Sequence, residues 1–452
     1  MSAHAWSDLP KALGGGETLA KVNEALRTDG QYLAFSSTDA IVDPVTFGIK
    51  SVESDSALLV TVANAKGSVE VGKPDAAKFT LEALPEQWEE FFKPVPKMPY
   101  QSFWGMYGMN IKQEGVGVLG DQNAFAQSSH IWRRVLEILH DAHSGPVPTD
   151  PEPPETDDDF ITGRYIYVTA PHWGRSKVFV EKSGVGKQQI VFLHTAGSDS
   201  RQYHGVMNDK RVRDRLTMYA FDLPGHGRSF PPKDYVPGSH TNTEDAYVGC
   251  IAEVVKQLKL NKPIICGASM AGQVCLAIAI RNNEVRSGGT IPLQAADHLT
   301  MPRVWNDKAP NVNQSLFNPE WIYGMQSPTA PPSCKALVWH GYSAQAYGIF
   351  HGDLDFYFGG FDARDRVAKI NTALCPVYMM TGEYDWSTPP AVAEAVAKKI
   401  PGAMHKTMEG LGHFPATENP QRFVPYLLEA VEWVQKARKE GSDLSLFRMT
   451  DD

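Results

Sequence analysis

The sequence is poor in the features that nucleic-acid, membrane and metal proteins need. Its 43 lysines and arginines are outnumbered by 52 aspartates and glutamates, which gives a formal net charge of −9. Nucleic-acid binding depends on clustered basic residues, and a membrane-spanning helix needs about twenty consecutive apolar residues, a run that the chain lacks. No metalloprotease motif, phosphate-binding loop with lysine or dinucleotide fingerprint occurs either. We therefore expect a protein without metal or cofactor that acts on a small molecule, away from nucleic acids and membranes.

Cysteine is also scarce. The five cysteines are an odd number, they lie mostly in apolar segments, and no two have Cys-x-x-Cys spacing. They are Cys250, Cys266, Cys275, Cys334 and Cys375. Such residues are typical of buried free thiols in a reducing compartment. Because the amino terminus also lacks the charged-then-apolar pattern of a secretory signal, we expect a cytoplasmic protein.

A segment rich in proline and acid, residues 144–159, divides the chain. It has almost no apolar side chain to bury, so it is predicted to be an extended, solvated linker. A chain of 452 residues also exceeds what one hydrophobic core normally serves. We therefore expect an N-terminal domain at 1–143, a second domain at 160–440 and a tail at 441–452.

The first domain has the pattern of a small α+β unit. Alternating and amphipathic apolar patterns predict two strands and two helices, at 56–62, 77–83, 85–92 and 129–140. This order of strands followed by a tryptophan-bearing helix resembles a sterol-carrier-protein-2-like domain, a class that can hold a hydrophobic ligand. An aromatic and methionine cluster at 100–109 suits either a ligand cavity or packing against the rest of the protein or a second subunit. We favour packing, and a homodimer through this domain is one form that such packing takes.

The most informative segment is 264–272, which reads Ile-Ile-Cys-Gly-Ala-Ser-Met-Ala-Gly. A short apolar strand runs into a Gly-x-Ser-x-small turn and then into an apolar helix. Small residues at Gly267 and Ala271 permit a cramped strand-to-helix turn, which exposes the Ser269 hydroxyl at the positive end of the helix. This pattern predicts Ser269 as the nucleophile of an acyl-transfer reaction.

An acid and a histidine follow Ser269 along the chain. A strand-like segment at 376–380 leads to Asp385, and a later strand-like segment leads to His413. The order serine, acid, histidine is the α/β-hydrolase order, and it differs from the orders in chymotrypsin-type and subtilisin-type enzymes. The three residues are therefore predicted to form a catalytic triad.

The identity of the acid rests on its place in the sheet. Asp297 follows the sixth core strand, from which some α/β-hydrolases supply the acid, and Glu383 lies two residues from Asp385. We favour Asp385, because Gly-Glu-Tyr-Asp with Pro389 following matches the commoner acid after the seventh strand. The candidates for the wall of the substrate pocket are then Thr195, Tyr203, Asp297, His298 and Trp386.

The second domain is similar to the α/β-hydrolase superfamily. Eight strand-like segments alternate with mostly helical ones, which is the pattern of a doubly wound, mostly parallel sheet. They lie at 164–169, 177–180, 189–194, 216–222, 263–267, 288–294, 376–381 and 404–408. The resemblance implies that His413 takes the proton of Ser269 as it attacks a carbonyl, while Asp385 orients the imidazole. It also implies an oxyanion hole made of the backbone N–H groups of Met270 and Ala196.

Two positions depart from the family pattern. Thr195 stands where the family usually has glycine after the histidine of the third strand, and Ala271 replaces the second glycine of the serine turn. Both bear on the geometry of the oxyanion hole. His194 and His226 are interpreted as residues that brace their loops and take no part in the chemistry.

The segment between the sixth and seventh strands is unusually long. It inserts about eighty residues, where most connections of such units are far shorter. It is rich in aromatic residues and proline, and we expect a cap at about 300–370. Most of its aromatic side chains should form the cap's own core. The others should cover the active site, which favours a bulky hydrophobic or aromatic substrate.

Together these features predict a serine hydrolase that cleaves a hydrophobic, aromatic ester or lactone through an acyl-enzyme. A carbon–carbon bond hydrolase acting on a β-diketone is the alternative on the same fold. Ser269 excludes haloalkane dehalogenases and epoxide hydrolases, because both need a carboxylate at that position. A hydrophobic-ligand receptor that keeps the fold without turnover is the alternative of a different class.

Overall fold

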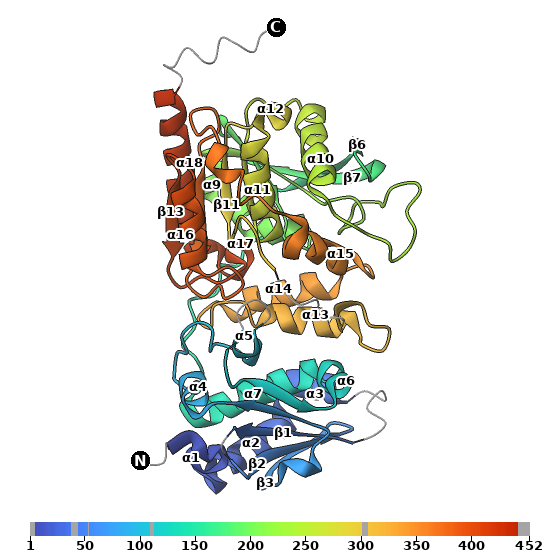
Figure 1. Cartoon of the computed structure of the whole chain (residues 1–452), viewed down its shortest axis with the longest axis vertical. Helices are drawn as coiled ribbons and strands as arrows, with labels where there is room; N and C mark the ends of the chain where they lie inside the picture. Colours follow the sequence, from blue (N-terminus) through green and yellow to red (C-terminus); the bar gives the residue numbers. More distant parts are fainter. Residues whose placement is uncertain (1–4, 38–43, 53, 109–112, 301–305, 442–452) are drawn as a thin grey trace. The chain divides into compact units, whose positions relative to one another are not determined.

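The computed structural model describes residues 5–37, 44–52, 54–108, 113–300 and 306–441. The chain divides into two compact units, one made of Met1–Asp150 with Val304–Thr329 and the other of Pro151–Arg303 with Ala330–Asp452 (Figure 1). The division between Asp150 and Pro151 falls inside the segment predicted as a linker. The predicted tail lies outside the described residues, except for Gly441.

An eight-stranded sheet forms the centre of the second unit. Its strand order is β13-β12-β11-β10-β8-β9-β7-β6. Strand β7 pairs antiparallel with both of its neighbours, β6 and β9, and all the other pairs are parallel. The strands are β6 Thr162–Ala170, β7 Gly174–Ser183, β8 Gln188–Leu193, β9 Leu216–Phe221, β10 Ile264–Ala268, β11 Gly289–Leu293, β12 Tyr378–Gly382 and β13 Met404–Met408. All eight predicted strands are present, so the prediction of a doubly wound, mostly parallel sheet is confirmed.

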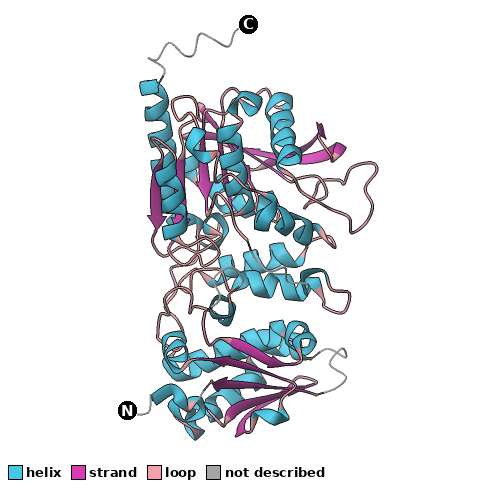
Figure 2. Cartoon of the chain, in the orientation of Figure 1, coloured by secondary structure: helices cyan, strands magenta, loops and turns pink. Residues whose placement is uncertain are grey.

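Helices cover this sheet because its central strands bury apolar side chains on both faces. The helices are η3 Ser200–Tyr203, α8 His204–Asn208, α9 Lys210–Arg213, α10 Glu244–Gln257, α11 Met270–Ile280, α12 Asn282–Val285, α16 Pro390–Lys399, α17 Pro415–Glu418 and α18 Pro420–Gly441. Figure 2 draws helices in cyan and strands in magenta. Helices α10, α11 and α12 contact one another, as do α8, α17 and α18. Buried α18 residues such as Phe423 and Leu427 pack with Ile264 and Met380 of the strands in one apolar core.

The insert between β11 and β12 differs from the single cap that the sequence predicted. Its first part, with η4 Asn306–Lys308 and α13 Gln314–Tyr323, belongs to the first unit. The reason is local packing: Glu320 forms a buried ion pair with Arg133, and the Phe317 ring lies 5.7 Å from that of Trp104. The second part, with α14 Pro332–Ser343, α15 Ile349–Asp355, the π-helix η5 Phe356–Gly360 and η6 Val367–Lys369, belongs to the second unit.

The first unit holds a five-stranded sheet in the order β3-β2-β1-β4-β5. Its strands are β1 Val45–Ser51, β2 Ala57–Ala63, β3 Lys66–Gly72, β4 Phe79–Ala83 and β5 Gly117–Gly120. Its helices before α13 are η1 Ala5–Ser7, α1 Leu9–Ala12, α2 Gly16–Thr28, α3 Gly30–Ser36, η2 Pro74–Ala76, α4 Pro85–Phe91, α5 Phe103–Tyr107, α6 Gln122–Gln127 and α7 Ser129–Ser144. The two strands and two helices expected from the sequence are present, whereas β1, β3 and β5 were not predicted.

The aromatic cluster of the first unit is core. Phe103 and Trp104 are buried, with rings 6.0 Å from Trp88 and 5.0 Å from Trp132 respectively. Packing is thus the role of these two residues, and Met109 lies outside the described residues. In the part of the chain that the structure describes, no helix is both long and apolar enough to cross a membrane.

Candidate active site

Ser269 sits in a sharp turn between β10 and α11. Its backbone has φ 60° and ψ −123°, a strained conformation for a residue with a side chain, and its N–H donates to the Leu293 carbonyl at 3.0 Å. A Cβ on Gly267 would lie 2.7 Å from Cβ of Ala271, and a Cβ on Gly272 would overlap the Leu293 carbonyl oxygen. Both positions therefore require glycine, Gly267 because of Ala271 and Gly272 because of the strand carbonyl beside it.

His413 and Asp385 meet at the carboxyl ends of the strands. Nδ1 of His413 lies 2.9 Å from Oδ1 of Asp385, and both side chains are buried. The same carboxylate oxygen accepts the backbone N–H groups of Ser387 at 2.8 Å and Thr388 at 3.2 Å. These bonds fix the carboxylate where it can orient an imidazole and stabilise its cation.

The two alternative acids have other partners. Oδ2 of Asp297 lies 2.5 Å from Nζ of Lys399, and Oε2 of Glu383 accepts the backbone N–H of Gly410 at 2.8 Å. His298, which follows Asp297, places Nδ1 2.9 Å from the Phe361 carbonyl oxygen. The geometry thus places Asp385, rather than Asp297 or Glu383, beside the histidine.

Glu418 holds the loop that carries His413. It is fully buried in α17, and its carboxylate accepts the backbone N–H groups of Gly412 and Phe414, one on each side of the histidine. The N–H of Tyr384 donates to the Leu411 carbonyl at 2.9 Å, which joins the acid loop to the histidine loop. Glu418 was not predicted, because an acid in a short helix carries no signal in the sequence until its loop is folded.

Tyr357 of η5 is a second residue that sequence analysis missed. Its hydroxyl lies 3.1 Å from Oγ of Ser387 and 3.0 Å from Oγ1 of Thr388. A hydrogen bond with the Ser269 hydroxyl lowers the pKa of Tyr357, against the effect of burial. Burial, and next the charge of Asp385, raise the pKa of Tyr357 to about 12, so it stays a neutral donor.

Within the described residues, no hydrogen bond joins the Ser269 hydroxyl to the His413 ring. The structure therefore joins the acid to the histidine and places the serine on the predicted turn, without the third link of the triad. Catalytic hydrogen bonds are often long without substrate and shorten in the reacting complex. Ser269 and His413 are both nearly inaccessible to solvent, at 5% and 2% exposed.

The predicted oxyanion residues occupy two neighbouring turns. Met270 is the first residue of α11, where the backbone N–H has no acceptor within the helix. Ala196 lies in the loop after β8, and both of its neighbours are tied down. The Thr195 N–H donates to Oε1 of Gln202 at 2.9 Å, and the Gly197 N–H donates to Oδ2 of Asp353 at 2.8 Å.

One of the predicted pocket residues has a different place. Tyr203 belongs to the core: its hydroxyl donates to the Leu193 carbonyl at 2.8 Å, and its ring stacks on Phe192 with centroids 4.5 Å apart. An aromatic side chain at that point completes the core under the sheet, so the pocket assignment was wrong. Thr195 is buried and its hydroxyl contacts that of Tyr342 in α14. Trp386, next to Asp385, is buried as well.

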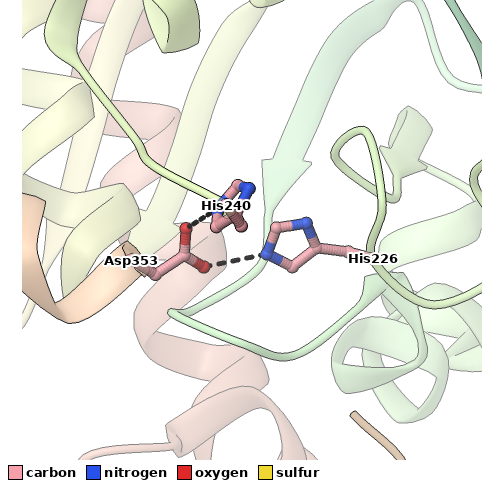
Figure 3. A group of neighbouring side chains, drawn as sticks. All are labelled: His226, His240 and Asp353. Atoms are coloured by element: carbon pink, nitrogen blue, oxygen red, sulfur yellow. Dashed lines mark hydrogen bonds and ion pairs between the residues drawn. The ribbon is translucent and has the colours of Figure 1, made fainter. Parts of the chain in front are cut away.

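The two bracing histidines have structural partners. Nε2 of His194 accepts the Leu223 N–H at 3.1 Å, and its Nδ1 lies 2.8 Å from the Thr195 carbonyl oxygen. His226 contacts Asp353, and with His240 these residues form a group whose ligand atoms lie within 4.8 Å of one another (Figure 3). Within the described ranges this group is where a metal ion would find three ligands.

The five cysteines are buried and unpaired, and burial raises the pKa of the Cys266 thiol, which makes it unreactive.

The fold and the serine turn define a hydrolase of the α/β type. Residues 190–425, just over half of the chain, match the model of the alpha/beta hydrolase family. The chain belongs to this family.

Named relatives and solved structures agree with this assignment. A putative esterase/lipase of Mycoplasma genitalium is 22% identical over 276 residues, covering 58% of this chain and 96% of the relative. The chain is similar in structure to an esterase from Thermogutta terrifontis, with a TM-score of 0.50, 21% identity and coverage of 61% of this chain and 99% of that one. A putative aryl esterase from Burkholderia cenocepacia has a TM-score of 0.52, 18% identity and coverage of 60% and 100%.

Proposed function

We propose that this protein is a serine hydrolase in which Ser269, His413 and Asp385 act as nucleophile, base and acid. The observation that carries the proposal is the 2.9 Å approach of His413 to Asp385 in a buried site, at the strand ends that also carry the strained serine turn. A serine held in that backbone conformation costs folding energy, which proteins retain mainly where the strain serves a function.

The reaction follows from these roles. His413 takes the hydroxyl proton as Ser269 Oγ bonds to the substrate carbonyl carbon, and the electron pair of that carbonyl moves to its oxygen. The N–H groups of Met270 and Ala196 stabilise the oxyanion. Collapse of the intermediate expels the alcohol, which receives the proton from His413, and leaves an acyl-enzyme. Water then adds with the same proton transfers and releases the acid.

The substrate that we put first is a hydrophobic, aromatic ester or lactone. We infer that residues 330–370 act as the cap, because Tyr342, Phe350 and Tyr357 of this segment are buried and Tyr357 lies beside the serine. A water-excluding aromatic cover favours apolar acyl or alcohol groups. Ester and lactone chemistry also occurs among proteins of similar fold, which include an enol-lactonase from Burkholderia xenovorans LB400 (TM-score 0.50, 18% identity).

A covalent probe and a substrate panel test the proposal. A fluorophosphonate should label the wild-type protein at Ser269 and leave Ser269→Ala unlabelled. The wild type should hydrolyse aryl esters or lactones, and in ¹⁸O water the label should enter the acid product. Turnover of β-diketones without turnover of esters would instead establish the carbon–carbon bond hydrolase. Folded wild-type protein that neither labels nor turns over any of these compounds would favour the receptor.

We propose that the first unit is related to the sterol-carrier-protein-2-like class and forms a homodimer, and that the protein is cytoplasmic. Analytical ultracentrifugation of the full chain tests the dimer, and fractionation of the source cells tests the compartment. A monomer at micromolar concentration would contradict the homodimer.

A further inference from the structure

Asp353 is a buried carboxylate that the triad chemistry leaves unused. It belongs to α15 and has no exposed surface. Its two oxygens point at two imidazoles, with Oδ1 2.8 Å from Nε2 of His240 and Oδ2 2.8 Å from Nε2 of His226 (Figure 3). His226 lies in the loop after β9, and His240 lies in the loop before α10. Both histidines belong to one connection, residues 222–243, so one carboxylate of the cap segment holds two points of a single loop that is far from it in the sequence.

Two further donors complete the set around this carboxylate. The Gly197 N–H donates to Oδ2 at 2.8 Å, and Nδ2 of Asn242 donates to Oδ1 at 3.3 Å. A carboxylate offers about four acceptor positions, and four N–H groups occupy them here. A buried charge is costly unless it is both paired and hydrogen-bonded, and Asp353 meets both conditions.

The charge of His226 follows from its partners. Nε2 faces the carboxylate of Asp353, and Nδ1 lies 3.2 Å from the Pro224 carbonyl oxygen. Because both neighbours only accept hydrogen bonds, both ring nitrogens carry a proton. Burial by itself lowers the pKa of His226, but the charge and hydrogen bond of Asp353 outweigh it and the pKa is raised. The Asp353 carboxylate therefore favours the protonated form of this imidazole.

The same cluster reaches both proposed oxyanion residues. Gly197 directly follows Ala196, so its bond to Asp353 fixes the peptide next to the proposed donor. Nδ2 of Asn242 lies 3.3 Å from Oδ1 of Asp353 and also 3.3 Å from Sδ of Met270. Gly197 has φ +64°, and a Cβ there would lie 2.8 Å from the Phe350 ring, so the cap segment packs tightly on this loop.

We propose that Asp353 is a positioning residue of the oxyanion hole, through which the cap segment holds the Ala196 and Met270 turns in register. This inference rests on the proposed function. The three ligand atoms of His226, His240 and Asp353 lie close enough together for a divalent metal ion. The hydrogen bonds account for this grouping without one, because all four acceptor positions of the carboxylate are occupied by N–H donors.

The test compares Asp353→Asn with Asp355→Asn, a matched change in the same helix at a side chain that is 51% exposed. Removal of one oxyanion donor costs about 10²–10³ in kcat. We expect Asp353→Asn to lower kcat of aryl-ester hydrolysis about 100-fold, with KM within about threefold of wild type. Asp355→Asn should match the wild type. Fluorophosphonate titration counts the competent sites in each preparation, so that loss of folded protein is not taken for loss of rate.

A second readout reports on the oxyanion hole alone. A trifluoromethyl ketone adds to the serine and carries an oxyanion in its adduct, so its affinity should fall with kcat in Asp353→Asn and stay unchanged in Asp355→Asn. If Asp353→Asn does not fold, Asn242→Ala keeps the two histidines on the carboxylate and should still lower kcat about three- to tenfold. Wild-type kcat in the folded variant would overturn the proposal.

Two outcomes separate this inference from the proposed function. An active wild type with Asp353→Asn equal to Asp355→Asn overturns only the positioning role. A wild type that neither labels at Ser269 nor hydrolyses esters overturns both. Mass spectrometry of the purified protein should find no stoichiometric metal, and one equivalent of zinc whose removal abolishes activity would replace the hydrogen-bond assignment by a metal site.

Discussion

Asp385→Asn isolates the charge of the proposed triad acid. The amide oxygen of asparagine can still accept the N–H groups of Ser387 and Thr388, so the loop should keep its geometry. What disappears is the negative charge beside His413, whose Nδ1 lies 2.9 Å from Oδ1 of the acid. Opposite unit charges about 4 Å apart attract by about 4 kcal/mol at an effective dielectric constant of 20. That attraction is present only when the imidazole is protonated in the transition state.

Four kcal/mol corresponds to a factor of about 10³ in rate, since each 1.36 kcal/mol is about tenfold. We therefore expect kcat/KM of Asp385→Asn for an aryl ester to fall by about 10³ to 10⁴, with the thermal unfolding midpoint nearly unchanged. Asp297→Asn serves as the control, because the Asp297 carboxylate pairs with Lys399 and should change kcat/KM by less than about threefold. A larger loss in Asp297→Asn than in Asp385→Asn would refute the assignment.

The other predictions address the serine turn, the cap tyrosine and a buried ion pair. Tyr357→Phe should lower kcat by about tenfold to a hundredfold in steady-state assays, since it removes the hydroxyl beside the serine; an unchanged kcat would assign Tyr357 to packing. Gly272→Ala should lower the free energy of unfolding by about 1–3 kcal/mol in urea titration, because its Cβ overlaps a strand carbonyl, whereas Ala271→Gly should cost less than about 1 kcal/mol. Burial opposes ionisation of Glu181, but hydrogen bonds from a histidine and an arginine lower its pKa to about 2 from 4.5. The stabilisation by the Glu181 carboxylate is therefore complete above about pH 4.5 and is lost as the pH falls through about 2. The difference in thermal midpoint between wild type and Glu181→Gln should shrink over that interval. A difference that grows as the pH falls would contradict this prediction.

The strands and the order of the candidate triad follow from local patterns. Apolar runs such as 264–268 are buried on both faces, and this makes a parallel strand visible in the sequence. The Gly-x-Ser-x-small turn places Ser269, and the residues after β12 and β13 place Asp385 and His413 at the same edge of the sheet. Tyr203 shows the limit, because its position after a strand does not reveal whether the ring faces the site or the core.

The division of the insert and the residues that surround the site depend on partners elsewhere in the chain. Arg133 binds Glu320 of α13, a contact between residues 187 positions apart that holds α13 in the first unit. Asp353 meets His226 across 127 positions, and nothing next to it in the sequence distinguishes it from the exposed Asp355.

The sequence by itself determined the sheet, the serine turn and the order of serine, acid and histidine, because each of these arises from neighbouring residues and from the direction of parallel strands. The tertiary structure decided which acid stands beside His413, which part of the insert joins each unit, and which carboxylate braces the loop that holds Ala196. The physical reason is that a buried charge or hydroxyl is stable only where distant segments supply its partners, and those partners are not identifiable until the chain has folded.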